Sequence, residues 1–261
     1  MGQIPVSVTH MLRALTLLAL LMVAPMRADA QTLKLLTAGA FKPVALDLIS
    51  AFEARTGVKV EVQNDTAGAL TRRVESGEAF DVVIVPTPNL DTLARKGKVD
   101  PASVTPLAKV GIGVAVRAGS PHPPLETVEQ FKEAVLKARK VAYIDPASGG
   151  SSGIYLDKLF QRLGIAEAVR AKAVLVAGGH SAERLVSGEA DLAIQQISEL
   201  LPVGGVTLVG PLPEAVQNYT VYGCGISSGS RVKDAARSFV SAVTAHATDE
   251  VVRAKGMLPA R

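Results

Sequence analysis

Four short runs of glycine and small polar residues are the parts of this sequence best suited to hold a ligand. They are Thr37-Ala38-Gly39-Ala40, Asp65-Thr66-Ala67-Gly68, Ala147-Ser148-Gly149-Gly150-Ser151-Ser152-Gly153 and Ala177-Gly178-Gly179-His180-Ser181. Glycine lets a ligand approach the backbone closely, and the serine and threonine hydroxyls add hydrogen-bond donors. Each run stands where an apolar stretch gives way to a segment of helical period, so the unpaired N–H groups of a helix start would add further donors.

Converging runs of this kind predict a pocket for an anion that needs neither a metal nor a charged side chain. Any one run on its own is also explained as a tight turn with an N-cap, but four together favour the pocket. The candidate ligand contacts within the runs are Thr37, Ala38, Gly39, Ala40, Thr66, Ala67, Gly68, Ser151, Ser152, Gly153 and Ser181.

Arginines on the helices that begin at these runs are candidates for a charged contact. Arg72 and Arg73 follow the second run, and Arg184 follows Ser181 by three residues, which makes Arg184 a further candidate ligand contact. If the ligand is a carboxylate, one of the three is expected to form a bidentate clamp on it. The alternative is that each is a solvated surface residue.

Signals of catalysis are weak. The pattern Gly-x-Ser-x-Gly occurs at residues 149–153 and 225–229, and Asp191 and His246 would complete a Ser, Asp, His order. Neither stretch is framed as a strand-to-helix turn, so a serine hydrolase stays a minor alternative. The histidines lack metal-ligand spacing. We therefore expect a non-enzymatic protein with no catalytic residue, no metal and no cofactor.

The composition is that of a folded protein. Of 261 residues, 48% are hydrophobic and 20% are charged. The formal net charge of +4 is scattered along the sequence, and aromatic residues make up only 4% of it. A weak basic excess with so few aromatic residues gives no support to a nucleic-acid partner.

Residues 1–30 are typical of a cleaved secretory signal peptide. Arg13 precedes the apolar run 14–24, and Ala28-Asp29-Ala30 ends the segment before Gln31. The apolar run is shorter than the roughly 20 residues that a membrane span needs. We therefore expect a periplasmic protein, and since Cys224 is the only cysteine, one without an internal disulfide.

Beyond the leader, short apolar runs alternate with segments of helical period, which predicts an α/β fold with mainly parallel sheets flanked by helices. The expected strands are Leu33–Ala38, Lys59–Gln63, Val82–Pro86, Gly111–Arg117, Val141–Ile144, Ala173–Val176, Leu192–Gln195, Val206–Val209 and Thr220–Ile226. The expected helices are Val44–Arg55, Ala69–Ser76, Asn89–Lys96, Ser151–Leu163, Ser181–Val186 and Lys233–His246.

Two zones rich in proline and glycine, at residues 118–124 and 201–213, interrupt this alternation. Two such zones are typical of a chain that crosses between two lobes and returns. We expect a discontinuous first lobe made of residues 31–112 and 218–261, and an inserted second lobe made of residues 113–217.

The order of these motifs resembles that of the periplasmic molybdate-binding proteins of ABC transporters, over about residues 33–257. The segments that carry the resemblance are Leu35-Leu36-Thr37-Ala38-Gly39-Ala40, the stretch 66–77 followed by Phe80-Asp81-Val82-Val83-Ile84, and Asp145-Pro146 followed by Gly153-Ile154-Tyr155 and Leu163-Gly164. The resemblance implies a two-lobed type II periplasmic binding protein that closes on a small anion between its lobes. It also implies a membrane permease as partner, and we expect a monomer.

The sequence departs from that family at positions that contact the ligand. Ala40 stands where the family usually has a serine, and the position of the family's binding tyrosine falls in Ile194-Gln195-Gln196, with Gln196 the better match. The resemblance favours a molybdate-type oxyanion, whereas a pocket that loses hydroxyls and gains amides favours a small organic carboxylate. A glutamine oxygen would suit a ligand that brings its own hydroxyl or protonated carboxyl. A transport receptor and a ligand-sensing subunit remain equally compatible with these features.

Overall fold

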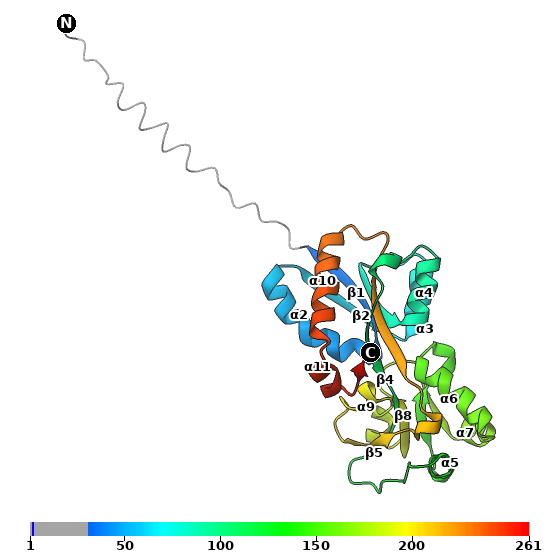
Figure 1. Ribbon diagram of the computed structural model, residues 1–261. Helices are drawn as coiled ribbons and strands as arrows, with labels where there is room; N and C mark the ends of the chain where they lie inside the picture. Colours follow the sequence, from blue (N-terminus) through cyan, green and yellow to red (C-terminus); the bar gives the residue numbers. More distant parts are fainter. Residues whose placement is uncertain (1, 3–30, 261) are drawn as a thin grey trace.

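The structure, a computed structural model, describes residue 2 and residues 31–260, and it shows two mixed sheets that are each covered by helices (Figure 1). The two sheets with their helices form two lobes, named lobe 1 and lobe 2 below. The predicted signal peptide, apart from residue 2, lies outside the described residues. No helix in the described part of the chain has the length and apolar character of a membrane span.

Lobe 1 is built on a six-stranded sheet with the strand order β11-β4-β10-β3-β1-β2. β1 runs parallel to β2 and β3, whereas β10 runs antiparallel to β3 and β4. The bounds of these strands are β1 (Thr32–Ala38), β2 (Lys59–Asp65), β3 (Val82–Pro86), β4 (Thr105–Val110), β10 (Thr220–Ile226) and β11 (Leu258–Pro259).

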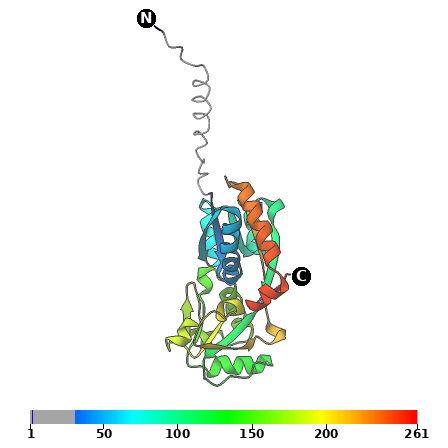
Figure 2. The same ribbon diagram turned by 90° about the vertical axis from the view of Figure 1, so that its left-hand side faces the viewer.

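Helices cover both faces of this sheet. On one face α2 and α10 pack together, with the rings of Phe52 and Phe239 edge to face at 5.2 Å, and Figure 2 shows these helices side by side in blue and orange-red. Pro43 stands in the first turn of α2, and Gly57 ends the helix with φ 71°, a backbone conformation that suits glycine. The bounds in lobe 1 are η1 (Gly39–Phe41), α2 (Lys42–Thr56), α3 (Ala67–Glu75), α4 (Thr87–Arg95), η2 (Pro101–Ser103), α10 (Lys233–His246) and α11 (Asp249–Ala254).

Lobe 2 is built on a five-stranded sheet with the order β7-β6-β8-β5-β9, in which β6 runs parallel to β7 and β8 and β5 runs antiparallel to β8 and β9. Phe131 of α5 and Phe160 of α6 are buried in one core, and Leu185 of α8 and Leu200 of α9 lie in a second. The bounds are β5 (Ile112–Arg117), α5 (Val128–Lys137), β6 (Val141–Ile144), η3 (Pro146–Ser148), α6 (Ser151–Arg162), α7 (Ala166–Arg170), β7 (Ala173–Val176), α8 (Glu183–Val186), β8 (Leu192–Gln196), α9 (Ile197–Leu200), β9 (Val206–Pro211) and η4 (Glu214–Val216).

Two crossings connect the lobes. Only Gly111 separates β4 of lobe 1 from β5 of lobe 2, and the chain returns to lobe 1 between β9 and β10. Gln217 in the return crossing donates from Nε2 to the carbonyl oxygen of Ile112 (2.9 Å), and its Oε1 accepts from the Ile112 N–H (2.8 Å). The side chain therefore takes the place of a strand partner and ties the two crossings together.

The two-lobed α/β fold predicted from the sequence is confirmed, but the expectation of mainly parallel sheets is wrong in part. β4 runs toward lobe 2 and β10 returns from it, so the two must lie antiparallel where they pair. β5 begins directly after β4 and runs antiparallel to both of its neighbours in lobe 2. The sequence expectations also missed β4, because a proline and a lysine interrupt its apolar pattern.

Candidate ligand site between the lobes

A pocket with about 520 Å³ of space between atoms, counting its open mouth, lies where the two lobes meet. Strand ends and helix starts of both lobes line it. Its lining residues are Ala38, Gly39, Ala40, Lys42, Asn64, Asp65, Thr66, Ala67 and Tyr222 of lobe 1 and Ile144, Gly150, Ser151, Ser152, Gly178, Gly179, His180, Gln196 and Glu199 of lobe 2.

Three helix starts contribute backbone groups to this pocket. The turn η1 leads into α2, α3 begins after Thr66, and α6 begins after Gly150. Thr66 caps α3, because its Oγ1 accepts from the Ala69 N–H (3.2 Å). Unpaired N–H groups and the positive ends of the helix dipoles favour negative charge at such places.

Gln196 is the most constrained polar side chain of the pocket. It is 2% exposed, and its Oε1 accepts from the hydroxyl of Tyr222 (2.8 Å). Its Nε2 has no hydrogen-bond partner among the described residues. Burial, followed by the nearby Glu199 carboxyl, raises the pKa of Tyr222 well above its usual range, so the phenol keeps its proton and remains the donor. The amide nitrogen of Gln196 is therefore left for an acceptor in the pocket.

Glu199 brings a carboxyl group into the same pocket from the short helix α9. Its Oε1 lies so close to Gly39 that a Cβ at that position would overlap it. Burial raises the pKa of the Glu199 carboxyl to about 8, against a smaller opposing effect of Gln195. The Nδ1 of His180 lies 2.7 Å from the backbone oxygen of Glu199 and must carry the proton, because a carbonyl oxygen can only accept.

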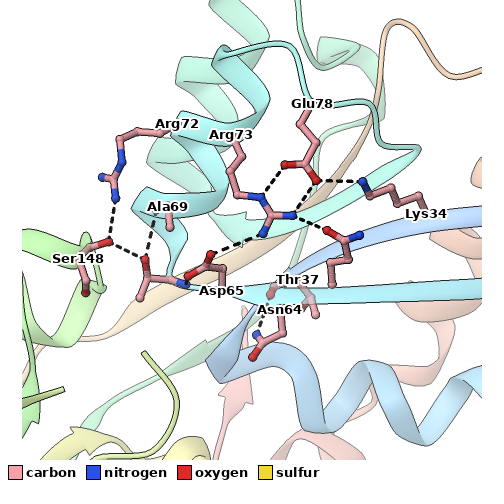
Figure 3. A network of polar contacts seen from close by, with 11 residues as sticks. Lys34, Thr37, Asn64, Asp65, Ala69, Arg72, Arg73, Glu78 and Ser148 are labelled. Atoms are coloured by element: carbon pink, nitrogen blue, oxygen red, sulfur yellow. Dashed lines mark hydrogen bonds and ion pairs between the residues drawn. The ribbon is translucent and has the colours of Figure 1, made fainter. Parts of the chain in front are cut away.

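Contacts between the lobes hold the cleft closed beside the pocket. Arg72 Nη2 donates to the carbonyl oxygen of Ser148 (3.2 Å), as Figure 3 shows, and Thr66 Oγ1 donates to the same oxygen (2.6 Å). The Gly68 N–H donates to the carbonyl oxygen of Gly149 (3.0 Å). These two glycines are so close that a Cβ on either would lie 2.7 Å from the Cα of the other.

The structure brings most of the candidate ligand contacts together. Those that line the pocket are Ala38, Gly39, Ala40, Thr66, Ala67, Ser151, Ser152 and Gln196.

The remaining loop candidates lie just behind the pocket wall. Thr37 is fully buried, and its Oγ1 donates to the carbonyl oxygen of Ala38 (3.2 Å). Gly68 packs against Gly149, and Gly153 packs against the backbone oxygen of Ile144. These glycines therefore serve close packing at the sites where the sequence predicted ligand contact.

Ser181 and Gln195 shape the fourth loop and do not line the pocket. The Ser181 N–H donates to Gln195 Oε1 (2.7 Å), and Gln195 Nε2 donates to the carbonyl oxygen of Gly179 (2.9 Å). Both polar ends of the Gln195 amide are thus used to fix the backbone of this loop. Of the two neighbouring glutamines, only Gln196 lines the pocket.

None of the three candidate arginines lines the pocket. Arg72 binds Ser148 across the lobes, and Arg184 pairs with Glu189 (3.0 Å). Arg73 binds Glu78 through Nε (2.5 Å) and through Nη2 (2.7 Å), next to Lys34, as Figure 3 shows. Each guanidinium binds acceptors of the protein itself, and none of the three arginines lines the pocket, so the expected carboxylate clamp is not among the lining residues.

Sequence reasoning missed Lys42, Asn64, Asp65, His180, Glu199 and Tyr222 as lining residues. Asp65 and His180 stand within the runs already singled out but were not among the candidate ligand contacts, and Asn64 lies one residue before the second run. Glu199 lies three residues after Gln196 on a new helix turn, and Tyr222 comes from a strand that only the three-dimensional structure places next to the pocket.

Comparison with known proteins defines the class of this chain. Residues 33–258 match the family of bacterial extracellular solute-binding proteins, and the chain belongs to that family. The predicted membership among solute-binding proteins is thereby confirmed, and the predicted resemblance to the molybdate-binding proteins is confirmed at the level of the fold. Among the residues that the structure describes, there is no group of three or more His, Cys, Asp or Glu side chains arranged to hold a metal ion.

The similar proteins include one named as an enzyme and two named as binding proteins. An aconitate isomerase from Pseudomonas sp is 32% identical over 234 residues, which cover 87% of this chain and 88% of the isomerase. The periplasmic molybdate-binding protein of Azotobacter vinelandii has a TM-score of 0.72 at 20% identity, covering 88% of this chain and 100% of that one. The sulfate-binding protein of Mycobacterium tuberculosis has a TM-score of 0.70 at 19% identity, covering 88% and 87%. The two structures share the fold at identities too low to carry over a ligand.

Proposed function

We propose that the pocket binds a small organic polycarboxylate, and that the protein interconverts the double-bond isomers of such an acid. The observation that carries the binding proposal is Gln196. Tyr222 fixes its oxygen, so its buried Nε2 presents a donor that needs an acceptor oxygen. A buried donor without a partner costs about 1–3 kcal/mol, which a carboxylate oxygen would relieve. The three helix starts supply donors for further carboxylate oxygens.

The apolar part of the wall supports an organic acid over a bare oxyanion. Ala38, Ala40, Ala67 and Ile144 set carbon surface among the polar groups of the pocket. A tetrahedral oxyanion has no carbon atoms to place against them, whereas the skeleton of a polycarboxylate does. The oxygen of Gln196 does not help to distinguish an organic acid from an oxyanion, because it accepts from Tyr222 and not from the ligand.

The relative at 32% identity supports the isomerase part of the proposal. It covers nearly the whole of both chains and carries the name aconitate isomerase. Aconitate is an unsaturated tricarboxylic acid, and it combines the features that this pocket suits: several carboxylates on a short carbon skeleton. We therefore propose cis-aconitate and trans-aconitate, or a close analogue, as the substrates.

A second candidate function is that of a receptor that delivers the same acid to an ABC permease without changing it. The match to the extracellular solute-binding family and the closing contacts between the lobes favour it. In either case we propose that residues 1–30 are a cleaved leader, that the mature protein is a periplasmic monomer, and that its ligand is small and anionic. Mass spectrometry and gel filtration of the exported protein test the first two points.

The test uses the purified mature chain, residues 31–261, with cis-aconitate, trans-aconitate, tricarballylate and molybdate as probes. Thermal shift measures binding, because a compound that binds only the folded state raises its apparent stability. Proton NMR separately measures conversion between the aconitate isomers. We expect a larger shift with the tricarboxylates than with molybdate, and conversion of either isomer into the mixture. Binding without conversion would favour the receptor, and a response to molybdate alone would overturn both candidates.

A further inference from the structure

Two carboxyl groups line the pocket, and only one of them has an ion-pair partner among the described residues. Asp65 accepts from the Thr66 N–H through Oδ1 (2.8 Å) and lies 3.5 Å from Nη1 of Arg73 through Oδ2. Glu199 makes no ion pair with any residue in the described part of the chain. An unpaired carboxyl group in an anion pocket opposes the binding of a negative ligand when it is ionised, so its presence calls for a chemical role.

Neighbouring elements hold Glu199 in place. Gly39 lacks the side chain that would occupy the position of the Glu199 carboxyl, and Asn64 Nδ2 closes the other side of that space, 3.9 Å from where the Cβ of an alanine at residue 39 would lie. The bond from His180 Nδ1 fixes the backbone oxygen of Glu199 at 2.7 Å. Lys42, Asp65 and Tyr222 are the other titratable groups that face this part of the pocket.

We propose that Glu199 is the residue that takes the proton from one end of the substrate and returns it to the other. This inference rests on the isomerase function proposed above and names the residue that performs it. Two features of the structure support it: the carboxyl group lies in the same pocket as the Gln196 donor, and it has no competing ion-pair partner among the described residues. The raised pKa, about 8, keeps both protonation states accessible near neutral pH, as a group that both accepts and donates a proton requires.

The chemistry balances without an added reactant. In aconitate the methylene group lies between a carboxylate and the carbon–carbon double bond. The ionised Glu199 removes one methylene proton, and the C–H electron pair spreads over three carbons as an allylic anion. Protonated Glu199 then returns the proton to the carbon at the opposite end, and the double bond forms at the carbon that lost it. The conformation held during transfer decides between cis and trans. Gln196 Nε2 and the helix starts would stabilise the charge that spreads onto the carboxylates.

The decisive comparison is between Glu199→Gln and Glu183→Gln. Glu183 is an exposed glutamate on α8 outside the pocket and serves as the matched control. We expect Glu199→Gln to lower kcat for aconitate at least about a hundredfold, in the range of general acid–base catalysis, while the thermal shift with aconitate persists. Glu183→Gln should keep the wild-type kcat and the wild-type thermal shift with aconitate. With aconitate that carries deuterium at its methylene group, the wild type should move deuterium to the carbon at the opposite end, and Glu199→Gln should leave it in place.

The outcomes separate this inference from the function on which it rests. If the wild type neither converts aconitate nor moves its methylene deuterium, the proposed isomerase function fails. If the wild type converts aconitate and Glu199→Gln remains within threefold of it, the function stands and the assignment of Glu199 is overturned. Should Glu199→Gln fold poorly, Glu199→Asp supplies the test. It keeps the carboxyl but withdraws it by one methylene, so kcat should fall while the rise of kcat/KM with pH toward about 8 remains.

Discussion

Two glutamates of this protein show how the same side chain is put to opposite uses. On the surface of lobe 1, Glu78 binds Arg73 and Lys34, and these cations lower its pKa to about 2 (Figure 3). In the cleft, Glu199 has no cationic partner among the described residues, and burial raises its pKa to about 8. The surface glutamate forms ion pairs with cations of the protein and thereby contributes to stability. The cleft glutamate has no ion-pair partner, and the amide nitrogen of Gln196 has no hydrogen-bond partner, among the described residues.

The difference predicts opposite responses of stability to pH, and the largest effect belongs to Glu199. In the folded protein its carboxyl keeps a proton up to about pH 8, whereas in the unfolded chain it releases that proton near the ordinary value of 4.5. Its contribution to stability is therefore fully present below pH 4.5 and is lost as the pH rises to about 8, by several kcal/mol since each unit corresponds to about 1.4 kcal/mol. Urea unfolding from pH 5 to 9 should show the free energy of unfolding of Glu199→Gln rising relative to that of the wild type up to about pH 8. A constant difference across that range would contradict the raised pKa.

Removing the amide of Gln196 should lower the affinity of the protein for its ligand. We expect Gln196→Leu to weaken the binding of aconitate at least about tenfold, because a hydrogen bond to a charged oxygen contributes about 1.5–3 kcal/mol. Calorimetry measures this directly. The substitution also leaves the Tyr222 hydroxyl without its acceptor, so the double variant Gln196→Leu with Tyr222→Phe should recover stability but not affinity. Full affinity in either variant would show that the amide does not touch the ligand.

Glu78 should matter for stability and not for binding. Glu78→Gln removes the ion pairs to Arg73 and Lys34, and because all three side chains are partly exposed the expected loss is about 1 kcal/mol at pH 7. The stabilising effect of the lowered pKa is present above pH 4.5 and disappears as the pH falls toward 2, so wild type and variant should converge in acid. Denaturant titrations at pH 7 and pH 3 test this, with unchanged aconitate affinity as the complementary result.

The smallest effects are expected at the arginines that the sequence singled out. Arg72→Ala removes one hydrogen bond between the lobes, so the closed form loses about 1 kcal/mol or less and the affinity should fall by no more than a few-fold. Arg184→Ala breaks only an exposed pair with Glu189 and should bind aconitate as the wild type does. A tenfold loss in Arg184→Ala would place a charged contact in the pocket that the structure does not contain.

The sequence was informative where local chemistry decides the structure. Gly39 and Thr66 could be placed together because loops that follow parallel strands meet at the same edge of a sheet. Ser151 belongs to the lobe built on the other sheet, and it was placed with them through the resemblance to two-lobed proteins that bind a ligand between their lobes. Tyr222 and Glu199 could not be found in this way, because their roles depend on pairing between β10 and β3 and on a helix of only four residues. The arginines were misjudged for a related reason: their partners, such as Glu78 and Glu189, outcompete a ligand, and a linear pattern does not show which acceptor lies nearest.

The contact between Gly68 and Gly149 has a consequence for how the protein rests without a ligand. Their backbones touch only because neither residue has a side chain. A methyl group at either position would therefore push lobe 1 and lobe 2 apart at this contact. We expect Gly68→Ala to shift the balance between closed and open arrangements of the lobes toward the open one without altering a residue that lines the pocket. In Gly68→Ala the residues that line the pocket stay unchanged but the closed form is less populated. The ligand should therefore associate faster and dissociate faster.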